Sequence, residues 1–91
     1  MTNENRVAVV TGGGQGIGKG IVEQLCRDGY AVVLADLNEA TAKATADELV
    51  AKGFKVSFVV GDVSKKEAHV KFVEKAVAEF GRLDTYINNA G

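Results

Sequence analysis

Residues 6–20 read RVAVVTGGGQGIGKG, and this stretch decides the fold that we predict for the whole chain. Its first six residues form a continuous run rich in β-branched side chains, which is typical of a strand buried on both faces. Six of the next nine residues are glycine, which lets a backbone approach an anion closely and adopt positive φ angles. A helix after such a loop directs free N–H groups and a partial positive charge at that anion. The stretch therefore predicts a strand, an anion-binding loop and a helix; a merely flexible loop is the alternative.

The rest of the chain repeats this alternation of apolar runs and helical patterns. The apolar runs predict strands at residues 6–11, 31–36, 55–60 and 83–88. Helical periodicity predicts helices at residues 17–28, 38–52 and 64–80. Asn38 is the expected N-cap of the second helix, and Ser64 with Glu67 forms an S-x-x-E capping box for the third. Each helix is followed by a glycine: Gly29, Gly53 and Gly81.

The first and third of these helices carry apolar stripes that we expect to face the sheet. The stripe on helix 17–28 comprises Ile17, Ile21, Val22, Leu25 and Cys26. The stripe on helix 64–80 comprises Val70, Val73, Ala76, Val77 and Phe80.

The element order β-α-β-α-β-α-β implies parallel strands joined by right-handed crossovers. The expected fold class is α/β, a Rossmann-type open sheet with strand order 3-2-1-4. Two helices should cover one face of the sheet, and helix 64–80 should lie alone on the other. Residues 1–91 would form the N-terminal part of a single dinucleotide-binding domain.

Composition argues against several other classes of protein. Apolar residues make up 46% of the 91 residues and charged residues 25%, which suits a globular core. Eleven basic and twelve acidic side chains give a net charge of −1, unlike a nucleic-acid-binding surface. The longest apolar runs are far shorter than the roughly 20 residues of a membrane helix. The polar start MTNENR has no signal-peptide pattern, and a single cysteine fits a reducing cytoplasm.

The glycine loop can be compared with three phosphate-binding motifs. G-x-G-x-x-G fits in no register, because a start at Gly12 places Ile17 at the last glycine. The P-loop motif nearly fits but fails at Gly20, where a hydroxyl should hold magnesium. The pattern T-G-x-x-x-G-I-G fits from Thr11 to Gly18.

With this pattern the chain resembles the short-chain dehydrogenase/reductase family along its whole length. Three further marks follow in the order that the family has: Asp36 ends the second strand, Asp62-Val63 follows the third, and Asn88-Asn89-Ala90-Gly91 closes the fourth. The resemblance implies a nicotinamide cofactor. Its pyrophosphate and adjacent ribose would lie on the backbone of Gly12, Gln15, Gly16, Ile17 and Gly18.

The remaining cofactor contacts follow from the same marks. Asp36 lies 18 residues beyond Gly18, where a carboxylate can accept hydrogen bonds from the adenosine ribose and repel a 2′-phosphate. The uncharged Gln15 and Leu37 also favour NAD(H) over NADP(H). By resemblance, Asp62 would bind the adenine amino group, Val63 would pack on the ring, and Asn89, Ala90 and Gly91 would pass under the nicotinamide-side ribose. The alternatives are a solvated carboxylate for Asp36 and a turn former for Asp62, and Asn88 is expected to tie strands together.

The catalytic residues of the family are a serine and a Tyr-x-x-x-Lys pair, and this chain has no such pair. Leu34 lies four residues after Tyr30, and Ala90 lies four after Tyr86. We therefore assign no catalytic residue, and expect this chain alone to be inactive. The parent protein is expected to be a homo-oligomer that interconverts a small secondary alcohol and a ketone.

Within the family, VVTGGGQGIGKGI and ADLNEATAK are most similar to bacterial acetoin (diacetyl) reductases, also called butanediol dehydrogenases. The alternatives are a 3-oxoacyl or sugar-alcohol reductase, a non-catalytic dinucleotide-binding module and, remotely, a P-loop NTPase.

Several other polar residues have no expected role in the site. Cys26 should be a buried, inert thiol, and His69 should lie on a solvated helix face without metal-ligand neighbours. Four charged residues should be solvated with helical neighbours: Lys43, Asp47, Glu48 and Lys52.

Overall fold

The computed structural model describes residues 6–89, which form a four-stranded sheet with helices on both faces. The strands are β1 (Val7–Thr11), β2 (Ala31–Asp36), β3 (Val56–Val60) and β4 (Thr85–Asn88). The helices are α1 (Gly16–Arg27), α2 (Glu39–Ala51) and α3 (Lys66–Phe80). All neighbouring strands pair in parallel, in the order β3-β2-β1-β4. The predicted strand order is therefore confirmed.

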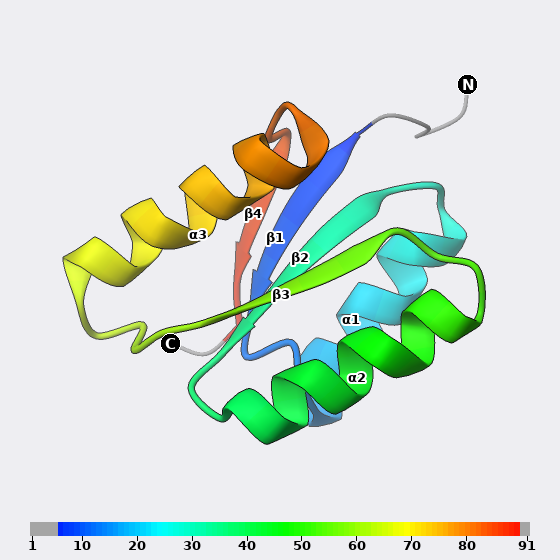
Figure 1. Ribbon diagram of the computed structural model, residues 1–91, viewed down its shortest axis with the longest axis horizontal. Helices are drawn as coiled ribbons and strands as arrows, with labels where there is room; N and C mark the ends of the chain where they lie inside the picture. The colour runs from blue at the N-terminus through cyan, green and yellow to red at the C-terminus, as the bar shows by residue number, and fades with distance from the viewer. Residues whose placement is uncertain (1–5, 90–91) are drawn as a thin grey trace.

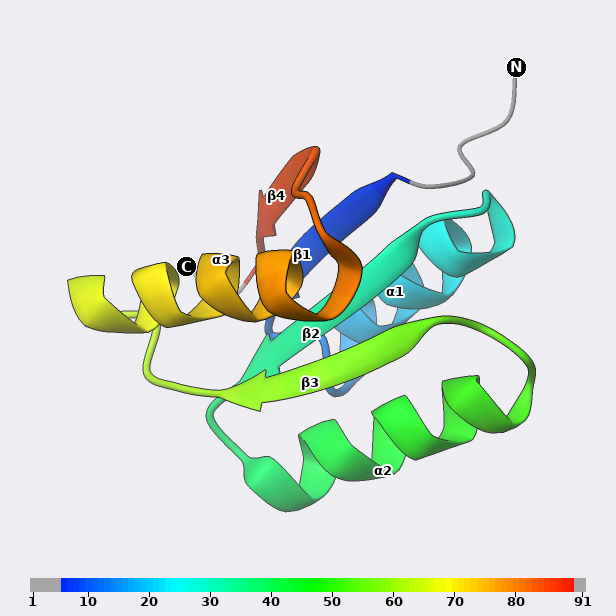
Figure 2. The ribbon, with the colours of Figure 1, turned by 45° about the horizontal axis from the view of Figure 1, so that its top comes forward.

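The helices divide between the two faces as predicted, with α1 and α2 on one side and α3 on the other (Figures 1 and 2). Side chains of β1 and β2 alternate between these faces, so both strands are buried throughout their apolar lengths. Val9 and Val33 pack toward Phe72 of α3, whereas Val10 and Leu34 join a second cluster with α1 and α2. No helix within residues 6–89 is both long and apolar enough to cross a membrane.

The buried face of α3 differs from the predicted stripe. Ala68, Phe72 and Ala76 are buried, while Val70 is 54% and Val77 49% exposed. Phe72 is the bulkiest of these side chains, and its full burial turns Val70 and Val77 to the opposite side of the helix. The predicted stripe was wrong at Val70 and Val77, because it left out Phe72, whereas Ala76 is buried and Phe80 packs against the core as predicted.

The predicted stripe of α1 is wrong at its first residue. Gly18, Val22 and Cys26 are buried at a spacing of four residues, but Ile17 is 79% exposed. Gly18 brings α1 very close to the end of β1, and this contact selects the face that includes it. Ile17 is left at the open end of the helix, beside the glycine loop.

The helix ends follow some of the predicted signals and depart from others. Asn38 caps α2, since its side chain accepts a hydrogen bond from the Thr41 amide at 3.0 Å. The capping box of α3 is wrong: the helix begins at Lys66, and the N-cap Lys65 makes no side-chain bond. The hydroxyl and amide of Ser64 instead donate to Asp62 Oδ1, at 2.7 and 2.9 Å. The nearby carboxylate accepts both, and the turn that results keeps Ser64 outside the helix.

Candidate functional site

The predicted cofactor residues gather at the carboxyl edge of the sheet, where all four parallel strands end. The glycine loop joins β1 to α1 there, Asp36 ends β2, and Asn89 follows β4. Asp62 and Val63 follow β3 and are joined to this group through Gly61, whose amide donates to the Asp36 carbonyl at 3.1 Å. Ala90 and Gly91, also predicted to bind the cofactor, lie outside the described residues.

The glycines of the loop meet strict backbone requirements. Gly12 and Gly16 have φ angles of 64° and 59°, in the left-handed region that favours glycine. A Cβ atom on Gly18 would lie 1.8 Å from the carbonyl oxygen of Gly12. Gln15, the N-cap of α1, makes no side-chain bond to the first amides of the helix. The helix therefore starts against a closely folded loop with backbone N–H groups at its open end, as a phosphate site requires.

Gly14 is held in the loop from both sides of its backbone. Its amide donates to Asp36 Oδ2 at 3.1 Å, and its carbonyl accepts from the hydroxyl of Thr45 at 2.5 Å. Thr45 lies on α2 and is only 4% exposed. The sequence analysis missed this residue, although a threonine at a buried position of an alanine-rich helix face signals a hydroxyl that needs a partner. β2 and α2 therefore fix the shape of the glycine loop.

Asp36 is a half-buried carboxylate with two backbone donors, not a freely solvated one. Besides the Gly14 amide on Oδ2, the Asn38 amide donates to Oδ1 at 3.1 Å. Each carboxylate oxygen has a second lone pair for a further donor. The side chain therefore stands beside the glycine loop with capacity to accept hydrogen bonds from a diol.

Asp62 forms a turn and is ionised at neutral pH. The Ser64 amide and then the Ser64 hydroxyl, both donating to its carboxylate, lower the pKa of Asp62. Asp62 therefore does form a turn, which was the alternative to a cofactor contact. Both of these hydrogen bonds go to the same carboxylate oxygen, Oδ1. Val63 beside it is half-buried against the α3 side of the core.

The end of β4 is tied to the end of β1 and to the loop. The Thr11 hydroxyl donates to Asn88 Oδ1 at 2.9 Å, so Asn88 joins the two strands as predicted. Asn89 Nδ2 donates to the Gly12 carbonyl at 3.5 Å and lies beside Gly18. Asn89 therefore contacts the loop at the point where α1 and β1 come closest.

His69 is not on a solvated helix face, so that prediction was wrong. Its Nε2 lies 2.7 Å from the Val63 carbonyl oxygen, and its Nδ1 lies 2.5 Å from the Tyr86 hydroxyl. The ring also meets Phe72 edge-on, with centroids 5.7 Å apart. Burial raises the pKa of Tyr86, so its phenol stays protonated at neutral pH. The charged neighbours of His69 in sequence hid this inward position, which Ala68 and Phe72 share.

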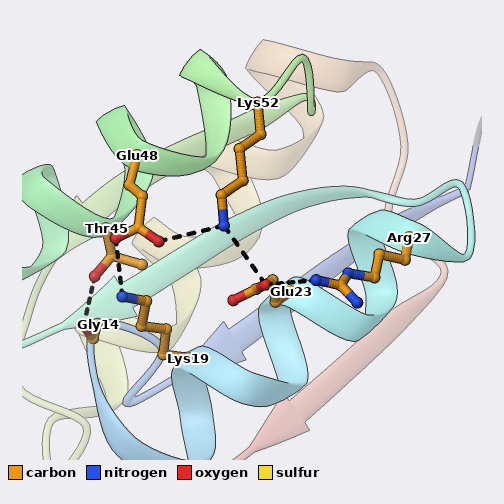
Figure 3. A network of polar contacts seen from close by, with 7 residues as sticks. All are labelled: Gly14, Lys19, Glu23, Arg27, Thr45, Glu48 and Lys52. Atoms are coloured by element: carbon orange, nitrogen blue, oxygen red, sulfur yellow. Dashed lines mark hydrogen bonds and ion pairs between the residues drawn. The ribbon is translucent and has the colours of Figure 1, made fainter.

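Two of the charged residues predicted to be solvated, Glu48 and Lys52, are exposed and pair within α2 as predicted, and they also connect α2 with α1 (Figure 3). Glu48 pairs with Lys19 of α1 at 2.9 Å and with Lys52 at 3.6 Å, and Lys52 reaches Glu23 at 3.7 Å. The hydrogen bond from Lys19 lowers the pKa of Glu48. Lys43 and Asp47 pair within α2, as predicted. Lys19 therefore binds a carboxylate of α2. In a P-loop protein, the lysine at this motif position would bind a phosphate.

Cys26 is buried, as predicted, and burial raises the pKa of its thiol to about 11. The thiol is therefore protonated at neutral pH, which fits an inert core residue. Among residues 6–89, histidine, cysteine and carboxylate side chains form no group of three that could hold a metal ion.

Comparison with known proteins agrees with this arrangement. The family described as short chain dehydrogenase matches residues 6–91. A diacetyl reductase, (S)-acetoin forming, from Staphylococcus epidermidis is 45% identical over 87 residues, which cover 96% of this chain and 34% of that protein. A 3-oxoacyl-[acyl-carrier-protein] reductase from Chlamydia muridarum is 43% identical over 88 residues, covering 96% and 36%. These matches confirm the resemblance to acetoin reductases, within a family that also holds other reductases.

Solved structures share the fold as well. The crystal structure of a hydroxysteroid dehydrogenase from Escherichia coli matches with a TM-score of 0.93 at 29% identity, over 99% of this chain and 38% of that one. This chain spans about a third of the length of the relatives that it matches. The match over residues 6–91, together with the glycine loop and the parallel sheet behind it, shows that the chain belongs to the short-chain dehydrogenase family.

Proposed function

We propose that this chain is the NAD(H)-binding, N-terminal part of a single domain in a longer oxidoreductase. The observation that supports the proposal most is the bond between Asp36 Oδ2 and the Gly14 amide, since a carboxylate held against a glycine loop suits a ribose next to a pyrophosphate. The start of α1, where the left-handed Gly16 has open space beside it and Gly18 lets the helix approach the Gly12 carbonyl, fits a pyrophosphate. When bound, the nicotinamide ring donates or accepts the hydride. The residues of this chain bind and orient the cofactor.

The preference for NAD(H) over NADP(H) rests on charge. Asp36 carries a negative charge where the 2′-phosphate of NADP(H) would lie, and such a phosphate would be repelled. The neighbouring Leu37 and Gln15 are exposed and uncharged, so neither offers a cation to that phosphate. Asp62 and Val63 would take the adenine, and Asn89, Ala90 and Gly91 the nicotinamide side.

The substrate that we propose for the longer protein is acetoin or diacetyl, reduced at a carbonyl carbon. The support is the 45% identity to a diacetyl reductase over 34% of that protein's length. A 3-oxoacyl or sugar-alcohol reductase is the alternative within the family, since the Chlamydia reductase is nearly as similar. We further propose a cytoplasmic homo-oligomer. We also propose that residues 1–91 alone bind cofactor without turnover, because they hold no Tyr-x-x-x-Lys pair.

Calorimetric titration of the purified protein with NAD tests the proposal. NADP and Mg-ATP are titrated in the same way as competing ligands. Asp36→Ala should weaken NAD binding by about 10- to 100-fold, the range for a lost hydrogen bond to a charged group, and should raise the relative affinity for NADP. Asp47→Ala on α2 is the matched control, because its partner Lys43 is four residues away and exposed. Binding of Mg-ATP but not NAD, lost in Lys19→Met, would favour the P-loop alternative instead.

A further inference from the structure

Beyond the direct cofactor contacts, we propose that His69 is a positioning residue for the adenine end of the site. It holds the Val63 carbonyl in place by bridging it to Tyr86 of β4. This inference rests on the proposed function, because it concerns the loop that would carry the adenine.

The bridge joins three separate parts of the fold. Val63 lies in the loop after β3, His69 near the start of α3, and Tyr86 in β4 at the register position of Val9. The imidazole stands between the other two, 2.7 Å from the carbonyl and 2.5 Å from the hydroxyl. Edge contact with the fully buried Phe72 fixes the plane of the ring. A histidine confined in this way sets the position of the loop backbone.

The hydrogen-bond roles follow from the chemistry of the partners. A carbonyl oxygen only accepts, so Nε2 of His69 must carry the proton that it donates to Val63. In the neutral ring, Nδ1 then accepts from the Tyr86 hydroxyl, which can either donate or accept. All three groups are half-buried and satisfied by one another. Removing the imidazole leaves two half-buried polar groups without this partner, which is costly.

The bridge acts on one end of the site only. The loop after β3 is attached to the glycine side through the Gly61 amide and the Asp36 carbonyl, at 3.1 Å. A Cβ on Gly61 would lie 2.8 Å from Phe72, so this stretch already packs tightly on α3. His69 supplies the tie on the opposite side, next to Asp62 and Val63. Loss of the bridge should therefore disturb the adenine contacts and leave the glycine loop and Asn89 unchanged.

The test compares the two halves of the cofactor. Binding of AMP, nicotinamide mononucleotide and NAD is measured by NMR titration for the purified protein and three variants. His69→Phe keeps an aromatic ring against Phe72 but removes both nitrogens, and should weaken AMP and NAD binding by about three- to tenfold. His69→Gln keeps an N–H donor for the Val63 carbonyl and should recover much of that loss. Nicotinamide mononucleotide should bind all variants equally.

If His69→Phe does not fold, Tyr86→Phe provides a second test, because it removes only the hydroxyl that bonds to His69. AMP binding to this variant should weaken by about two- to fivefold. Equal weakening for both half-cofactors would mark His69 as a general structural residue and overturn the inference, as would unchanged AMP binding in the variants. An unsubstituted protein that binds neither NAD nor AMP would overturn the proposed function as well, which separates the two failures.

Discussion

Gly18 and Gly20 lie two residues apart in α1 and are subject to opposite constraints. A Cβ at Gly18 would sit 1.8 Å from the Gly12 carbonyl oxygen, whereas a Cβ at Gly20 meets nothing within 4 Å. The first glycine is thus required by the close approach of helix and loop. The second only adds backbone freedom to the unfolded chain and lowers helix propensity.

Alanine substitutions should therefore have opposite effects on the free energy of unfolding. Gly18→Ala should lower it by about 3 kcal/mol or more, because the backbone must move to admit the methyl group, and should abolish NAD binding. Gly20→Ala should raise it by about 0.5–1 kcal/mol. Urea denaturation followed by circular dichroism measures both. Equal destabilisation by the two substitutions would contradict the packing described here.

At the scale of elements, Asp84 joins the starts of β4 and β1. Its Oδ2 accepts from the Val7 amide at 2.8 Å, and its own amide donates to the Val7 carbonyl at 2.9 Å. The Arg82 guanidinium, followed by the Val7 amide, lowers the pKa of Asp84. The ionised carboxylate therefore stabilises the pairing of β4, which β1 alone holds in the sheet among the described strands.

The stability that Asp84 contributes should depend on pH. Because its folded pKa lies below the unfolded value of about 3.9, the contribution is complete above that value and is lost as pH falls through the folded pKa. The unfolding midpoint in urea, measured from pH 7 to pH 3, should be higher for the unsubstituted chain than for Asp84→Asn at neutral pH. The difference should shrink below about pH 4. Asp47→Asn, at an exposed pair within α2, is the control. A constant difference across this range would argue against the ionised form as the stabilising one.

At the scale of the whole molecule, the two faces of the sheet are covered unequally. α1 and α2 share one face, but α3 lies alone on the other (Figure 2). β4 is an edge strand within the described sheet, and α3 exposes both Val70 and Val77. Unpaired strand edges and exposed apolar side chains favour self-association.

Residues 1–91 should therefore associate in solution through this side. Val70→Lys combined with Val77→Lys should raise the dissociation constant of the associated form about tenfold or more, since each half-exposed valine loses its apolar burial. Val50→Lys on α2, at a similarly exposed valine, should have little effect. Sedimentation velocity over a range of concentrations measures the change. An equal response to all three lysines would assign the effect to net charge instead of this face.

Local signals in the sequence were sufficient for much of the fold. The β-branched runs of β1 and β2, the Asn38 cap and the terminal glycines depend on interactions within a few residues, and all were confirmed. The strand order followed from the alternation of strands and helices and from the fixed handedness of the crossovers. The candidate site residues came from the family resemblance at four motifs, and parallel pairing brings the described ones to one edge of the sheet.

The errors arose where a residue has competing hydrogen-bond partners or where a bulkier neighbour takes the buried face. Ser64 binds Asp62 and does not cap α3, and Phe72 takes the buried face from Val70 and Val77. Nothing in the sequence indicated that Glu48 also pairs across to α1. His69 is identified as a bridge only when Tyr86, 17 residues later in the chain, lies beside it.

The sequence alone therefore determined the order of elements, the glycine loop and the positions of Asp36 and Asp62, because periodicity, capping and glycine freedom are local properties. Only the tertiary structure decided which face of α3 is buried, that Thr45 holds Gly14, and that His69 joins Val63 to Tyr86. These contacts depend on how the bulky side chains of α3 and the small residues of α1 and α2 fill the two sides of one sheet. Packing of that kind is settled by all the elements together.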